Sequence, residues 1–64
     1  MTVPPYQWGQ LMAGLNERTF KRRLAQESDP ERLRAALERE DTRPSPTRPE
    51  RIAALNKRLQ EVTA

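Results

Sequence analysis

The residues best suited to chemistry in this sequence are cations gathered in one short stretch. Arg18, Lys21 and Arg22 are spaced at i, i+3 and i+4, and Arg23 follows, so a helix here would carry a local cluster of positive charge. Such a cluster can neutralise phosphates, which is the electrostatic basis of nucleic-acid binding. We favour solvation or pairing within the chain for these cations, and an anionic protein partner and nucleic acid are the alternatives. Four later cations are further candidates for phosphate contacts: Arg48, Arg51, Lys57 and Arg58.

Three neighbouring carboxyl groups, Glu38, Glu40 and Asp41, raise the question of acid–base catalysis. Catalytic carboxyls need burial in a pocket to tune their pKa values, and a chain of 64 residues has little interior for one. We therefore expect a solvated helix face supported by Arg34 and Arg39. The chain has no His or Cys, and the acidic run lacks the spacing of a calcium loop. The sequence predicts no enzyme, metal, cofactor or small-molecule substrate.

Two aromatic residues near the N-terminus, Tyr6 and Trp8, are the largest potential anchors for a protein partner. Both residue types are enriched at interface hot spots because they bury a large area with little rotamer entropy. The competing interpretation places Trp8 at the centre of a small core, whereas Tyr6 follows a proline-containing arm at residues 1–5. We take both as candidate protein-binding residues.

The apolar and capping residues predict an all-α chain with four short helices, over about 6–14, 17–26, 30–41 and 48–63. The first helix carries an apolar stripe of Trp8, Leu11, Met12 and Leu15. Gly14 offers it a left-handed stop. A continuous helix over 6–27 is the alternative, but we favour a break because the apolar spacing jumps by five from Leu15 to Phe20.

The starts of the later helices have recognisable capping residues. Asn16 is a good N-cap for the second helix. Before the third and fourth helices, the pattern Ser/Thr-x-Pro-Glu occurs twice. It predicts a capping box between Ser28 and Glu31 and another between Thr47 and Glu50.

The fourth helix has an apolar seam with spacings of 3, 4 and 3, formed by Ile52, Leu55, Leu59 and Val62. The seam could close the bundle or pair with a second copy of the chain as a short coiled coil. Two heptads are marginal alone, so we favour packing within the chain and keep self-association as the alternative. Leu55, Leu59 and Val62 are therefore candidate protein-binding residues.

Residues 1–64 are expected to form one small domain, with a Pro-rich linker at 42–47 before the last helix. No apolar stretch is long enough for a membrane span or the core of a signal peptide. The expected location is therefore cytoplasmic or within a phage particle, and no membrane partner is expected.

The charge balance of 12 cations and 9 anions conceals an alternation along the chain. Residues 1–26 carry four cations and one anion, residues 27–41 three and six, and residues 42–64 five and two. This favours charge-matched packing within the chain or between copies. Because the core is also thin, we predict a non-enzymatic protein-interaction module, a small adaptor, regulator or assembly component of bacterial or phage type. A larger protein or a second copy is the expected partner, and a nucleic-acid-binding protein is the alternative.

Overall fold

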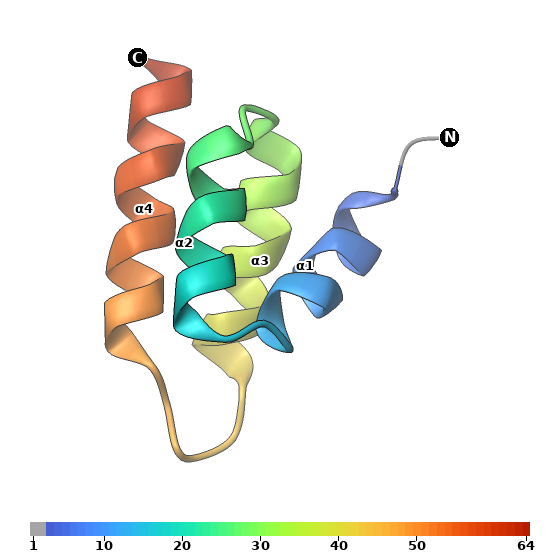
Figure 1. The fold of residues 1–64 in the computed structure, drawn as a ribbon, viewed down its shortest axis with the longest axis vertical. Coiled ribbons are helices and arrows are strands. Elements are labelled where there is room, and N and C mark those ends of the chain that lie inside the picture. Colours follow the sequence, from blue (N-terminus) through green and yellow to red (C-terminus); the bar gives the residue numbers. More distant parts are fainter. Residues whose placement is uncertain (1–2) are drawn as a thin grey trace.

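Four α-helices follow one another along the chain in the computed structural model, which describes residues 3–64 (Figure 1). They are α1 Pro5–Ala13, α2 Glu17–Gln26, α3 Pro30–Thr42 and α4 Pro49–Thr63. The all-α prediction is confirmed, and every predicted helix boundary lies within one residue of the observed one. Residues 1 and 2 of the predicted arm lie outside the described residues, and Pro5 already belongs to α1.

The centre of the bundle is α3, which packs against α1 on one side and against α4 on the other. In Figure 1, α2 crosses the front of the bundle and α3 lies behind it. A smaller contact joins α2 to α4. The outer side of α2 is therefore left free of the other three helices.

The predicted break between α1 and α2 is confirmed, because α1 ends at Ala13 and α2 begins at Glu17. The Oδ1 atom of Asn16 accepts a hydrogen bond of 2.9 Å from the amide of Thr19, as expected of an N-cap. The left-handed stop is wrong. Gly14 has φ −90° and ψ −3°, a conformation open to other residues.

The predicted capping boxes of α3 and α4 are wrong. Asp29, one residue closer to α3 than Ser28, is the N-cap, and its Oδ1 accepts from the amide of Glu31 at 2.9 Å. The N-cap of α4 is Arg48, not Thr47, and it makes no side-chain capping bond. Its guanidinium instead reaches other parts of the chain, so a tertiary contact replaces the local one at this helix start.

All four helices contribute to one apolar core, made of Trp8, Met12, Phe20, Leu24, Leu33, Ala36 and Leu55. The predicted stripe of α1 is wrong at Leu11, which is 57% exposed. The buried face of α1 is rotated toward Gly9, because a Cβ there would lie 3.3 Å from backbone atoms of Ala35 and Ala36. This close approach to α3 turns Leu11, about 100° around the helix from Met12, toward solvent.

The apolar seam of α4 closes the bundle within the chain, as favoured from the sequence. Leu55 is completely buried, and the partly buried Leu59 and Val62 pack against the core. Ile52 is half-buried. Among the described residues, no helix combines the length and apolar character needed to cross a bilayer.

Candidate binding surfaces

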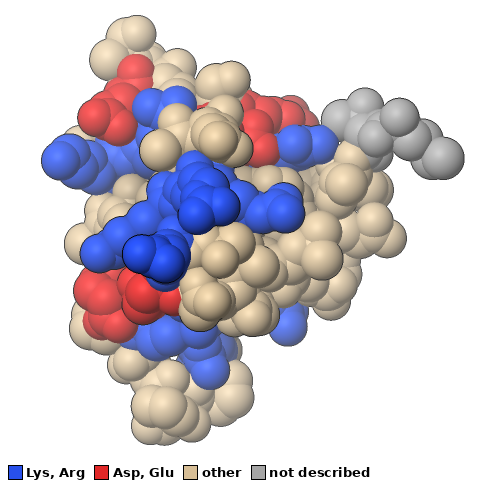
Figure 2. Space-filling model, viewed as in Figure 1, with Lys and Arg blue, Asp and Glu red and all other residues tan. Residues whose placement is uncertain are grey.

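The predicted cluster of Arg18, Lys21, Arg22 and Arg23, here called the α2 cation surface, is exposed on the outside of the bundle. The buried residues of α2 are Phe20 and Leu24, and position 22 lies midway between them in sequence, which places it on the opposite side of the helix. None of the four cations forms an ion pair with another described residue. Figure 2 shows Lys and Arg side chains gathered on this face.

Arg51 of α4, a candidate phosphate contact from the sequence, is buried and forms its hydrogen bonds within the protein. It is 3% exposed. Its Nε donates to Glu17 Oε1 at 2.6 Å, and Nη1 and Nη2 donate to the carbonyls of Met12 (3.2 Å) and Leu15 (2.6 Å). Its guanidinium carbon lies 4.4 Å from the centre of the Phe20 ring. One side chain of α4 thus satisfies carbonyls where α1 ends and fixes the start of α2.

Arg48 also binds within the chain, where it contacts α3 and the last residue of α1. It forms a two-pronged ion pair with Glu40 of α3, in which Nε donates to Oε1 at 3.0 Å and Nη2 to Oε2. Nη2 also donates to the carbonyl of Ala13 at 3.2 Å. The prediction that Glu40 lies on a solvated face is wrong, since it is 3% exposed. Burial is tolerated because the carboxylate is paired and hydrogen-bonded.

Arg58 provides the same kind of contact at the end of α2. Its Nε donates to the carbonyl of Glu27, the C-cap residue of α2, at 2.9 Å. Of the four additional cations considered for phosphate binding, only Lys57 is both exposed and without an ion pair among the described residues. The remaining three, Arg48, Arg51 and Arg58, hold helix ends together.

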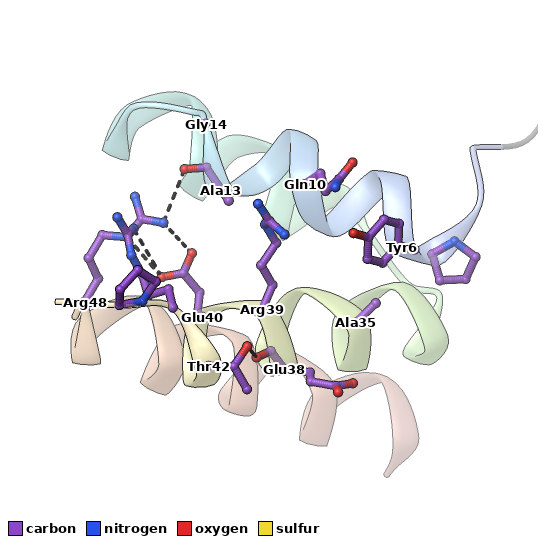
Figure 3. Close-up of a pocket in the computed structure, with 13 residues that line it drawn as sticks. Tyr6, Gln10, Ala13, Gly14, Ala35, Glu38, Arg39, Glu40, Thr42 and Arg48 are labelled. Atoms are coloured by element: carbon purple, nitrogen blue, oxygen red, sulfur yellow. Dashed lines mark hydrogen bonds and ion pairs between the residues drawn. The ribbon is translucent and has the colours of Figure 1, made fainter. Parts of the chain in front are cut away.

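A groove of about 830 Å³ lies between α1 and α3 (Figure 3). Tyr6 stands at one end of it and the Arg48–Glu40 pair at the other. Between them, Arg39 rises from α3 toward α1, while Glu38 points away from α1. Arg39 makes no ion pair or side-chain hydrogen bond with another described residue. The groove therefore carries the aromatic ring of Tyr6 at one end and the guanidinium of Arg39, which has no ion-pair partner among the described residues, between the helices.

The residues predicted to bind a protein are separated by the fold. Tyr6 is 67% exposed, whereas Trp8 and Leu55 lie in the core. Leu59 and Val62 are only partly buried but face the core. Only Tyr6 among these five is presented freely to a partner, and it lies at the groove.

The acidic side chains are divided between structural and exposed positions. Glu38 and Asp41 line a shallow depression between α3 and α4, to which α2 contributes no residue.

The hydrogen bond from Arg51 lowers the pKa of Glu17 below its ordinary value of 4.5. Within residues 3–64, no three acidic side chains come together in a way that could hold a metal ion.

The structure gives Arg39 and Gly9 positions that the sequence did not predict. Arg39 was assigned to support for a helix face, yet it lies in the groove beside Tyr6 and Gln10. Gly9, which sets the separation of α1 and α3, was not singled out. A glycine inside a helix next to a buried Trp is a usable signal of close helix packing, since glycine lowers helix propensity.

Comparison of the chain with known protein families, with curated proteins and with solved structures found no match.

Proposed function

We propose that this protein is a non-enzymatic protein-interaction module, a small adaptor, regulator or assembly component of bacterial or phage type. It acts in the cytoplasm or within a phage particle and docks on a larger protein through the groove between α1 and α3. The observation that carries this proposal is Tyr6, 67% exposed at the end of that groove.

The composition of the segment that contains Tyr6 supports a protein partner, while the charged residues of the groove come from α3 and the residues after it. Residues 1–16 contain no Lys, Arg, Asp or Glu, and Leu11 is exposed as well. The centres of protein interfaces are depleted in charge and enriched in Tyr. An exposed Tyr in an uncharged segment therefore matches an interface better than a surface selected only for solubility.

Arg39 specifies the chemistry expected of the partner. Its guanidinium lies in the groove without an ion-pair partner among the described residues, and guanidinium groups recognise carboxylates through paired hydrogen bonds. The partner segment is expected to place an apolar side chain against Tyr6 and a carboxylate on Arg39.

The carboxylates support a role in binding rather than catalysis. Glu40 is held by Arg48 at one end of the groove, and Glu38 points away from α1. Asp41 lies with Glu38 at the shallow depression between α3 and α4. Glu38 and Glu40 both line the groove, but with Glu40 bound to Arg48 and Glu38 directed away from α1, they are not arranged as the paired acid and base that catalysis requires.

Site-specific photocrosslinking in the native host tests this function. Benzoylphenylalanine at position 6 should crosslink one defined larger protein, whereas the same group at position 60, exposed on α4, should not. Arg39→Ala should reduce the crosslink strongly, and Arg34→Ala, an exposed cation of the same helix, should leave it unchanged.

Circular dichroism of each variant ensures that a lost crosslink does not reflect unfolding. Equal crosslinking from positions 6 and 60, or equal effects of the two arginine variants, would contradict a specific groove. A crosslink only to a second copy of the chain would replace the larger partner with self-association.

A further inference from the structure

The α2 cation surface is separate from the groove, because none of its four residues lines it. Its four side chains are exposed and make no ion pair with a described residue. Arg18 and Arg22 are one helical turn apart, about 6 Å along the axis. Like charges at this spacing destabilise a helix slightly, so their arrangement has a small folding cost without a folding benefit.

Acidic side chains neutralise this surface only in part. The only acidic residue in α2 is Glu17, which accepts a hydrogen bond from Arg51 and also interacts with the charge of Lys21. The exposed acids Glu38 and Asp41 line a depression formed by α3 and α4 alone. Arg18 and Arg22 therefore face solvent on the side of α2 opposite its buried residues, although Figure 2 also shows Asp and Glu side chains on this face of the molecule.

We propose that the α2 cation surface binds the phosphate backbone of a duplex nucleic acid. Repeated phosphates are the natural ligand for several unpaired cations on one helix, because each contact releases a condensed counterion. An acidic protein is a poorer match because protein interfaces need apolar anchors, and the outward positions of α2 between Arg18 and Arg22 offer none.

The duplex form follows from the placement of the aromatic residues. Proteins that bind single strands stack bases on exposed aromatic side chains. Trp8 and Phe20 are buried, and Tyr6 lies at the groove between α1 and α3. Because the α2 cation surface has no exposed aromatic residue on which bases could stack, its cations contact the phosphates of the duplex, and its binding to the duplex does not depend on base sequence.

Fluorescence anisotropy with a short labelled duplex DNA, measured with the intact chain between about 50 and 200 mM salt, tests the proposal. The logarithm of the binding constant should fall with the logarithm of the salt concentration, with a slope of about −0.9 for each phosphate contact and about −3.6 for four. Arg22→Gln should make the slope about 0.9 less steep, and the double variant Arg18→Gln/Arg22→Gln about 1.8.

Arg34→Gln is the matched control, because it removes the same charge from an exposed, unpaired position on α3. It should leave the slope unchanged. A parallel titration with duplex RNA identifies which nucleic acid supplies the phosphates, and binding of either duplex with this slope supports the proposal.

Four results would overturn it. One is the absence of duplex binding at the lowest salt concentration, where electrostatic attraction is strongest. Another is an equal loss of affinity in Arg22→Gln and Arg34→Gln, which would indicate only net charge. The third is displacement of the DNA by polyglutamate at matched charge and the fourth is tighter binding of a single strand, either of which would assign the surface to a different polyanion.

Discussion

Two regions with the same formal charge, residues 1–26 and residues 42–64, use their cations in opposite ways. Each segment has an excess of three positive charges. In the first, the cations of α2 face solvent without ion pairs among the described residues. In the second, three arginines turn inward to bind carboxylates and the carbonyls at helix ends. Equal charge therefore does not imply equal function.

The difference follows from what each segment faces in the fold. α4 and the linker before it lie beside the ends of α1 and α2, where carbonyl groups lack partners within their helices. Guanidinium groups satisfy several such carbonyls at once because their donors form a planar fork. α2 turns its buried side toward the core, so its cations are exposed and form no ion pair with a described residue.

The largest expected effect comes from removing the most buried arginine. Arg51→Ala should lower the free energy of unfolding by about 3 kcal/mol, because three charge-assisted hydrogen bonds are lost and the carbonyl of Leu15 is left without its donor. Urea unfolding followed by circular dichroism measures this. Lys57→Ala, on the same helix but exposed, should change stability by less than about 0.5 kcal/mol. If both variants behave alike, α4 does not use its arginines as described.

The ion pair between Arg48 and Glu40 should give the next largest effect. Glu40→Ala should cost about 2 kcal/mol, since it leaves the guanidinium of Arg48, with 21% of its side chain exposed, without its carboxylate. A double-mutant cycle should give a coupling of about 1 to 2 kcal/mol between the two residues. The matched pair is Glu40 with Arg43, which is 4.0 Å away and more exposed, and its coupling should stay below about 1 kcal/mol. Similar couplings for both pairs would contradict the special role of Arg48.

A smaller effect is expected from acid. Because the pKa of Glu17 is lowered in the folded protein, the ionised carboxylate stabilises the fold above pH 4.5, its ordinary value, and this contribution is lost as the pH falls through the lowered value. Glu17→Gln should therefore flatten the pH dependence of the urea midpoint on the acid side of pH 4.5. Glu50→Gln, at an exposed carboxylate without an ion pair among the described residues, is the control and should retain the wild-type slope. A wild-type slope in Glu17→Gln would show that the bond from Arg51 has no energetic consequence.

The helix boundaries could be predicted from the sequence because the residues that begin a helix act on their immediate neighbours. Asn16 and the prolines that begin α3 and α4 act on the residues next to them, so boundaries could be predicted closely. Glu40 and Arg51 could not be assigned to the interior, because their burial depends on partners 8 and 34 residues away. The groove was missed for the same reason, since Arg39 and Tyr6 line one groove only after α1 packs on α3.

The smallest effect on stability should come from the α2 cation surface. A small effect would show that these cations, unlike the inward-facing arginines of residues 42–64, are not needed for folding. Arg22→Gln and Arg18→Gln should each change the free energy of unfolding by less than about 0.5 kcal/mol. The sign should be slightly stabilising at low salt, because removing either charge relieves repulsion at i, i+4 spacing. Thermal unfolding at low and high salt measures both points. If instead either variant loses more than about 1 kcal/mol, these cations have a structural role like that of Arg51, and the contrast between the two basic segments fails. If stability is unchanged while duplex binding falls, the charge of α2 acts on a ligand and not on the fold.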